Sequence, residues 1–418
     1  MSGFRERLLP RRLGPQFSLL LGSGWVSNVG DGIALAAGPL LVASLTREPV
    51  VVAAAAALQR LPWLLFGLYA GVLADRLDRK RLVVAVDLAR AAVLVAFAAV
   101  LALGATGTGA VWLVLAVMFL LGTAETFADT AAPTLLPMVV DKPDLGIANA
   151  RLLAGYLTIN QLVAPPIGAV LFALGTAVPF GVQAGCVALG AVLIGRMRVP
   201  PLPARAEPTH VRRDIAEGFR WLWRHGPVRT LALTILVFNI TWGAAWSVLV
   251  LLAQDRLGLG PVGFGALTTA TAVGGLVSTA AYDWLERRFS LAALMRACLL
   301  TETLVHLGLA VTTLPAVALA LMFAFGLEAF VWGATARAVR QRAVPVQFQG
   351  RVGSVYTLGL MGGLVVGQGL GGVLASAWGV TAPFWFAFGG SAILLALIWR
   401  ALARIAHIDA EDADEVDG

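Results

Sequence analysis

The chain has 418 residues, of which 59% are hydrophobic and only 13% are charged. Soluble domains carry about 25% charged residues, so this composition excludes an ordinary soluble domain and predicts a protein that crosses the membrane many times. The net charge of +7 is carried by short basic segments between hydrophobic runs, as membrane orientation requires, and this distribution argues against nucleic-acid binding.

Twelve hydrophobic segments of membrane-spanning length follow one another along the chain, and together they predict an all-α integral membrane protein. A basic cytoplasmic arm covers residues 1–16. The first six segments form an N-terminal half (17–194) and run over 17–45, 50–74, 82–103, 110–136, 148–174 and 178–194. The second six form a C-terminal half (228–405) and run over 228–251, 264–285, 291–313, 316–339, 352–378 and 383–405. An acidic tail occupies 406–418.

The placement of basic residues predicts the orientation. If the N-terminus lies in the cytoplasm, the outer loops hold only Arg47 and Arg256, and nearly all other Lys and Arg residues face inward. We therefore expect both termini on the cytoplasmic side of the cell membrane. The linker at 195–227 is also basic, and its stretch HVRRDIAEGFRWLW places Ile215, Phe219 and Leu222 on one helical face. This spacing predicts an amphipathic helix on the inner membrane surface, either a tether between the halves or a regulatory element.

A short charged turn, GVLADRLDRKR, separates the second and third hydrophobic segments. It resembles the signature loop between helices two and three of the major facilitator superfamily, and the matching residues are Gly71, Asp75, Arg76, Arg79, Lys80 and Arg81. Asp78 stands where that signature has a second glycine. We expect Gly71 to let helices approach closely and Asp75 to meet the N-terminus of a neighbouring helix, so that the loop acts as a conformational latch.

The two halves repeat this pattern. Asp283, Glu286 and Arg287 lie around the end of the eighth segment much as Asp75, Asp78 and Arg79 lie after the second. Internal duplication of six-helix halves is typical of transporters with a midplane substrate site. The resemblance to the superfamily thus covers the whole chain, and Gly350-Arg351-Val352 is similar to the subgroup of macrolide and enterobactin exporters. We assign Asp283, Arg287, Arg351 and an expected Asp87–Arg90 ion pair to the latch as well.

Ionisable residues inside the hydrophobic segments are the candidates for proton coupling, because a charge at a helix centre costs about 2.5–3.5 kcal/mol on insertion scales. They are Asp31, Glu125, Asp129 and Glu328. Glu125 and Asp129 are four residues apart and share a helical face. The alternative for Asp31 is a structural pair with Arg60. Glu302 and His306 form a second pair at this spacing, interpreted as structural with a proton relay as the alternative.

Aromatic and amide side chains suit a cavity for an amphipathic compound. The candidates are Trp25, Asn28, Arg60, Asn160, Gln161, Asn239, Trp242 and Gln368. The sequence holds no Walker loop, HExxH, paired CxxC or nucleophile elbow, so we predict no enzymatic activity, metal or cofactor, and a pump driven by an ion gradient. Cys186 and Cys298 lie in apolar runs and are expected to be free thiols.

These observations predict a monomeric, proton-coupled exporter of small amphipathic compounds, such as a drug, a macrolide-like metabolite or a siderophore, working by alternating access. Two alternatives stay open. One is a proton-coupled importer of a nutrient. The other is a membrane receptor or assembly component that does not transport.

Overall fold

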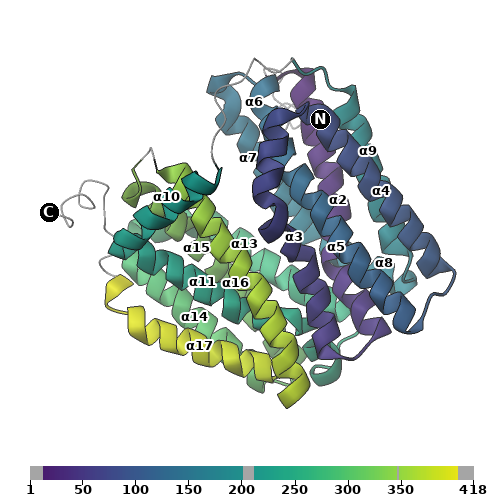
Figure 1. Cartoon of the computed structure of the whole chain (residues 1–418). Coiled ribbons are helices and arrows are strands. Elements are labelled where there is room, and N and C mark those ends of the chain that lie inside the picture. The colour runs from purple at the N-terminus through teal and green to yellow at the C-terminus, as the bar shows by residue number, and fades with distance from the viewer. Residues whose placement is uncertain (1–12, 201–210, 346–347, 403–418) are drawn as a thin grey trace. The chain divides into compact units, whose positions relative to one another are not determined.

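The computed structural model describes residues 13–200, 211–345 and 348–402, and every regular element in these ranges is a helix (Figure 1). Helices are expected here because apolar segments in a bilayer must satisfy their backbone hydrogen bonds internally. The helices form two compact units. Unit 1 holds the described parts of 1–47, 58–206 and 260–269, and unit 2 holds those of 48–57, 207–259 and 270–418.

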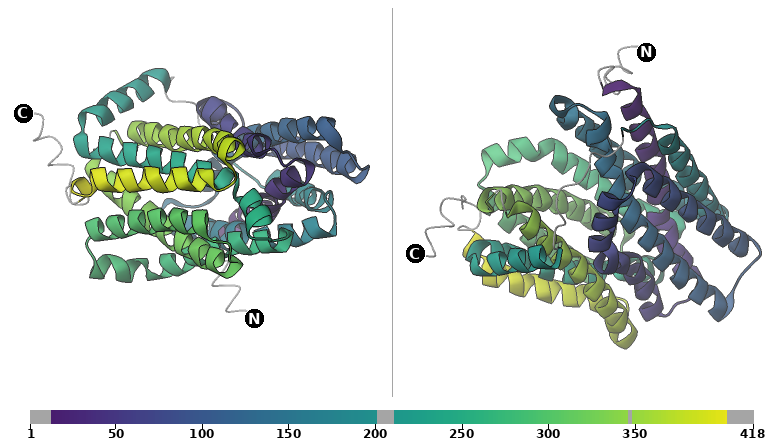
Figure 2. Two further views of the ribbon diagram at one scale, coloured as in Figure 1. Left: turned by 90° about the horizontal axis from the view of Figure 1, so that it is seen from below. Right: turned by 45° about the horizontal axis from the view of Figure 1, so that its top comes forward.

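Unit 1 is built around α2, which packs against α8 and α9, while α4 packs against α5 and α9. Figure 2 shows these helices from two further directions. The elements of this part of the chain are α2 (Gly14–Leu45), α3 (Pro49–Arg76), α4 (Arg79–Ala102), α5 (Gly107–Ala131), η2 (Ala132–Leu135), α6 (Leu136–Val139), η3 (Lys142–Asp144), α7 (Leu145–Gly155), η4 (Tyr156–Val163), α8 (Ala164–Leu174) and α9 (Val178–Arg196).

Unit 2 is built around α11, which packs against α16 and α17, while α14 packs against α15 and α17. The elements of this part are α10 (Val211–Arg224), α11 (Gly226–Ser247), α12 (Leu249–Leu251), η5 (Leu252–Arg256), α13 (Pro261–Arg288), α14 (Leu291–Val311), α15 (Pro315–Ala343), α16 (Gln349–Trp378) and α17 (Ala382–Ile398).

Within the described ranges, eleven helical segments are long and apolar enough to cross a membrane, and α17 is a shorter apolar helix. The predicted all-α membrane architecture is confirmed. The twelfth segment differs from the expectation, because the sequence predicts one helix over 383–405 whereas α17 ends at Ile398 and a turn separates it from the helical residues 401–402. Residues 403–405 lie outside the described ranges. The 17 residues of α17 correspond to roughly 25 Å at about 1.5 Å per residue, somewhat less than a typical hydrocarbon core.

Two predicted segments are not continuous α-helices. The segment 110–136 changes to a 3₁₀ turn at Ala132–Leu135, which contains Pro133. The segment 148–174 contains a π-helical stretch, Tyr156–Val163, directly before Pro165 and Pro166. Proline has no backbone N–H and clashes with the carbonyl group four residues earlier, so the regular ladder of hydrogen bonds is interrupted at both places.

Close contact between helices in unit 1 depends on glycine. A Cβ at Gly168 of α8 would overlap the carbonyl oxygen of Ile33 in α2, and one at Gly122 of α5 would overlap that of Gln59 in α3. Small residues at such crossings allow the backbones to approach and the helices to gain van der Waals contact. A Cβ at Gly71, in contrast, would meet no described atom beyond its own helix within 4 Å. Among the described residues Gly71 therefore makes no close helix contact, and its part in the latch stays a prediction.

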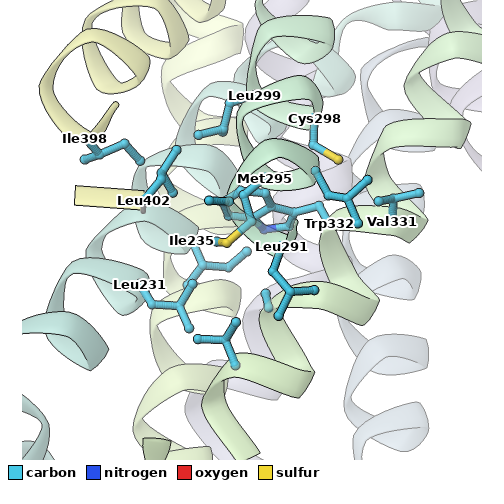
Figure 3. Packing of buried hydrophobic residues seen from close by; sticks show 14 of the residues in the cluster. Leu231, Ile235, Leu291, Met295, Cys298, Leu299, Val331, Trp332, Ile398 and Leu402 are labelled. Atoms are coloured by element: carbon cyan, nitrogen blue, oxygen red, sulfur yellow. The ribbon is translucent and has the colours of Figure 1, made fainter. Parts of the chain in front are cut away.

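Unit 2 has its own apolar core between α11, α14, α15 and α17. Figure 3 shows Met295 of α14 and Trp332 of α15 at its centre, with Ile235 of α11 beside Met295 and Ile398 of α17 at the left edge of the cluster. Trp332 also stacks on Phe238 with ring centroids 6.2 Å apart. This core fixes α14, on which the Glu302–His306 pair lies.

Candidate functional site

A cluster of charged side chains in unit 1 is centred on Arg90 of α4, whose side chain is only 3% exposed. Its Nη2 donates hydrogen bonds to Asp31 Oδ1 at 2.8 Å and to Glu125 Oε1 at 3.2 Å. Its Nη1 donates to Asp87 Oδ1 at 3.3 Å. The Arg90 cluster, defined by Arg90, Asp31, Asp87 and Glu125, thus joins α2, α4 and α5 around one guanidinium group.

Close packing places Asp31 in this cluster. α2 is continuous through Asp31, and a Cβ at Gly32 would lie 2.5 Å from the carbonyl oxygen of Asn160. A Cβ at Gly30 would lie 3.0 Å from Cys186 Cβ on α9. The glycines beside Asp31 therefore serve close contact with η4 and α9 rather than local unwinding.

The cluster holds three carboxyl groups against one cation. Arginine does not lose its proton in proteins, so the positive charge of Arg90 is permanent. Asp129 lies one turn beyond Glu125 and interacts electrostatically with the same cluster. An uncompensated charge in a desolvated site is costly, and binding of a proton by one carboxyl group reduces that excess. The arrangement can therefore bind and release a proton while Arg90 keeps the carboxyl groups in place.

Arg90 belongs to a buried cluster of carboxyl groups and not to the latch, where the sequence placed it. The structure gives Asp31 the partner Arg90 rather than Arg60, and Arg60 acts on Glu125 through longer-range electrostatics. The expected Asp87–Arg90 pair is present at 3.3 Å, but both residues lie with Asp31 and Glu125, whereas the sequence interpretation placed them with the latch. The i, i+3 spacing of Asp87 and Arg90 indicated their pairing in the sequence. No feature of the sequence indicated the hydrogen bonds from Arg90 to Asp31 and Glu125.

The charged turn after α3 fastens helix ends of unit 1 to one another. Asp78 caps α4 by accepting a hydrogen bond from the backbone N–H of Arg81 at 3.0 Å. Arg79 Nε donates to the carbonyl oxygen of Ala74 at 3.3 Å, and Lys80 Nζ donates to that of Met197 at 2.8 Å. Cations are favoured at helix C-termini, where unpaired carbonyl groups concentrate. The capping role of Asp78 was missed, although an Asp directly before the first residue of a helix is a usual cap signal.

The remaining latch candidates are mostly exposed side chains that do not belong to the hydrogen bonds of the charged turn named above. The Asp75 side chain lies outside the described parts of the structure, and Arg76, Arg81, Asp283 and Arg287 are exposed. Arg351 does not stand alone at the beginning of α16. Its Nη1 is 2.9 Å from Glu217 Oε2 of α10, a contact for which the sequence holds no signal.

In unit 1, several cavity candidates contact one another. Asn160 Nδ2 donates to the carbonyl oxygen of Asn28 at 3.4 Å, and Gln161 Nε2 donates to Asn160 Oδ1 at 2.6 Å. Trp25 packs so closely on Gly155 that a Cβ there would overlap its indole ring. Arg60 is exposed. Asn28, Asn160 and Gln161 therefore form a polar group where α2 meets η4, and Trp25 is held by α7.

In unit 2, Asn239 Nδ2 donates to the carbonyl oxygen of Ile235 in its own helix at 2.7 Å, and Gln368 is buried. Trp242 stacks on Phe325 with ring centroids 3.9 Å apart. These rings and His306 border a cavity of about 10 Å³, room for roughly one water molecule. The cavity is lined by Trp242, Ala245, Trp246, Leu249, Val305, His306, Leu309, Met322, Phe325 and Phe384.

Two buried glutamates lie near one another in unit 2. His306 Nε2 and Glu302 Oε1 are 3.3 Å apart, and Ser391 Oγ donates to the same carboxylate oxygen at 3.4 Å. Glu328 is 4% exposed, and Glu302 and Cys298 are its electrostatic neighbours. The spacing in the sequence identified the Glu302–His306 pair, which the structure contains. Ser391, contributed by α17, was missed because nothing in the sequence links it to α14.

Two helical units with charged groups buried within their apolar segments are typical of a multi-pass membrane transporter. The chain belongs to the family of transmembrane secretion effectors within the major facilitator superfamily, because the family model matches residues 13–417.

Two relatives that align with most of the chain support this assignment. The chain is 31% identical over 412 residues to the multidrug efflux pump Tap of Mycolicibacterium fortuitum, covering 94% of this chain and 96% of that protein. It is 24% identical over 395 residues to macrolide efflux protein A of Streptococcus pyogenes, covering 87% and 90%.

Solved structures show the same fold. The nucleoside transporter NupG superimposes with a TM-score of 0.73 at 11% identity, covering 93% of this chain and 99% of that one. A bacterial homologue of the human lysosomal transporter Spinster gives a TM-score of 0.73 at 13% identity, covering 94% and 98%. The predicted membership of the superfamily is confirmed.

Proposed function

We propose that the protein exports small amphipathic compounds across the cell membrane in exchange for protons, by alternating access. Both of its termini face the cytoplasm in this proposal. Two relatives that match most of the chain bear the names of multidrug and macrolide efflux proteins, which supports the direction and the class of compound. The Arg90 cluster supports the coupling to protons, and it is the observation on which this proposal rests.

In this mechanism Asp31 and Glu125 take up and release the proton. Both accept hydrogen bonds from the same nitrogen of Arg90, so protonation of either changes what holds α2, α4 and α5 together. A bound proton or substrate shifts an equilibrium between two conformations only through its differential affinity for them. Asp129 joins the cluster electrostatically, and Glu328 of α15 serves as the acid of unit 2 that corresponds to Glu125, 203 residues earlier in the repeat. The charged turn with Arg79 and Lys80 acts as the latch.

The binding region for the compound is assigned to aromatic and amide side chains, because an apolar surface with a few hydrogen-bonding groups suits an amphipathic molecule. Asn28, Asn160 and Gln161 supply the polar groups in unit 1. Trp242, with its stacked neighbour Phe325, supplies the aromatic surface in unit 2. We further propose that the protein works as a monomer and without nucleic acid.

Transport in proteoliposomes of known sidedness tests this function, with a macrolide antibiotic and a fluorescent cationic dye as the probes. A pH gradient should drive probe out of the cytoplasmic side, and Asp31→Asn or Glu125→Gln should abolish the gradient-driven component. The exposed Glu286→Gln variant at the end of α13 is the matched control and should transport normally. Gradient-driven flux that is undiminished in Asp31→Asn would remove Asp31 from the mechanism. Accumulation in the opposite direction would establish an importer instead.

A further inference from the structure

The amphipathic helix α10 has two different apolar faces. Its first face is covered by unit 2, since a Cβ at Gly218 would lie 2.6 Å from the carbonyl oxygen of Arg351 in α16. Leu222 is 3% exposed, and Trp221 stacks on Phe348 with ring centroids 5.6 Å apart. Figure 1 shows α10 beside the beginning of α16. This docked face accounts for the attachment of α10 and leaves the other face open.

The open face carries an aromatic pair and a strip of arginines. Phe219 and Trp223 are 51% and 50% exposed and stack on each other with centroids 5.6 Å apart. Arg213, Arg220 and Arg224 are exposed and follow one another at i, i+7 and i+11, a spacing that aligns them along one side of a helix. Two adjacent strips, one aromatic and one cationic, thus run along the same open face.

The position of α10 directly before a membrane-spanning segment indicates that the membrane surface covers this face. Only His225 separates the end of α10 from α11, which begins at Gly226 and belongs to a membrane-spanning segment. Arg229 in the first turn of α11 lies over the Trp223 ring, with its guanidinium carbon 5.8 Å from the ring centroid, so the aromatic strip is tied to the start of that span. An open helical face fixed at the end of a spanning helix lies at the level of the phospholipid headgroups.

We propose that the open face of α10 is a binding site for anionic phospholipids. Phe219 and Trp223 enter the boundary between headgroups and acyl chains, where amphipathic aromatic side chains are favoured. Arg220 and Arg224 bind the phosphate groups, and guanidinium groups match phosphate oxygens with paired hydrogen bonds. The bound lipids hold the segment that connects the two units, independently of which compound the protein transports.

The test uses the full-length protein in lipid nanodiscs, with an environment-sensitive NBD fluorophore on Ala216→Cys. Ala216 is exposed and lies on the same side of α10 as Trp223, two helical turns before it. One set of nanodiscs contains phosphatidylcholine alone, and a second contains increasing fractions of phosphatidylglycerol. We expect a blue shift of the NBD emission that grows with the phosphatidylglycerol fraction. The chain without Ala216→Cys, labelled in parallel, gives the background from its native thiols.

Arg220→Gln with Arg224→Gln is the decisive variant. A basic residue near an anionic surface is expected to contribute about fivefold to binding, so the double variant should not respond at a phosphatidylglycerol fraction that saturates the unsubstituted chain. Arg288→Gln with Arg342→Gln, two exposed arginines at the ends of α13 and α15, is the matched control and should respond normally.

Two outcomes would overturn the proposal. An equal blue shift in phosphatidylcholine alone would mean that the face enters the membrane without selecting anionic headgroups. Emission typical of water in every lipid mixture would mean that the membrane does not cover this face, and that a protein partner is the occupant to look for. The substituted arginines are exposed, so each variant should remain folded. A thermal unfolding midpoint equal to that of the unsubstituted chain checks this.

Discussion

Replacement of Arg90 by glutamine should destabilise the protein far more than an ordinary loss of a surface charge. The substitution removes three charged hydrogen bonds, of 2.8, 3.2 and 3.3 Å, and leaves three carboxyl groups without their cation. Each such bond is worth about 1.5–3 kcal/mol. The bonds share one guanidinium and are not additive, so we expect a loss near the 3–5 kcal/mol typical of breaking a buried ion pair.

Thermal unfolding of the purified protein measures this loss. At about 2–4 °C per kcal/mol for a unit of roughly 200 residues, the midpoint should fall by about 6–20 °C. Arg81→Gln is the control, because that side chain is 88% exposed and its pair with Asp78 is worth at most about 1 kcal/mol. Adding Asp31→Asn to Arg90→Gln should restore part of the stability. An Arg90→Gln midpoint within the error of the unsubstituted protein would refute the assignment of Arg90 as the centre of the cluster.

Three further predictions concern the packing and the docked helix. Gly122→Ala should destabilise unit 1 by forcing α3 and α5 apart, whereas Gly71→Ala should leave thermal unfolding unchanged or slightly improved, since alanine is the better helix former by about 0.5–1 kcal/mol. The hydrogen bond from Arg213 and the charge of Arg351 lower the pKa of Glu217 below its ordinary value of 4.5. The stabilisation that the Glu217 carboxylate provides is therefore complete above pH 4.5 and is lost as the pH falls through the lowered pKa. The protection of α10 amides, corrected for the intrinsic exchange rate at each pH, should decrease upon acidification, and Glu217→Gln should remove that pH dependence. His306→Leu should cost about 1–3 kcal/mol in thermal unfolding, because it removes a partner of a buried carboxylate, and an unchanged midpoint would show that the carboxylate has another sufficient partner.

Much of the helical architecture was predictable because it follows from local composition. Each spanning segment is an apolar run flanked by polar or basic residues, and such a run satisfies its backbone only as a helix. Pairs within one helix were also predictable, as with Glu302 and His306 or Asp87 and Arg90, because residues three or four apart share a face. The 3₁₀ turn that contains Pro133 and the π-helical stretch before Pro165 had a visible cause in the prolines but were not predicted.

The candidate site was only half predictable. The cost of burying a charge singled out Asp31 and Glu125, and both lie in the Arg90 cluster. The partner considered for Asp31 as the alternative was Arg60 and not Arg90, since both arginines are far from Asp31 in the sequence and nothing local distinguishes the two. The packing of α4 against α5 and α9, together with the close contacts of Gly30 and Gly32, determines which guanidinium reaches the carboxylate.

The amino-acid sequence by itself determined that this protein is a multi-pass helical membrane protein, where its helices lie and which of them bury charges. These properties depend on hydropathy and on spacing within a single helix. Only the tertiary structure decided that Arg90 holds three carboxyl groups, that Arg79 and Lys80 bind helix ends, and which side of α10 stays open. Those properties depend on which helices are neighbours, and side-chain volume and glycine contacts between distant segments fix that choice.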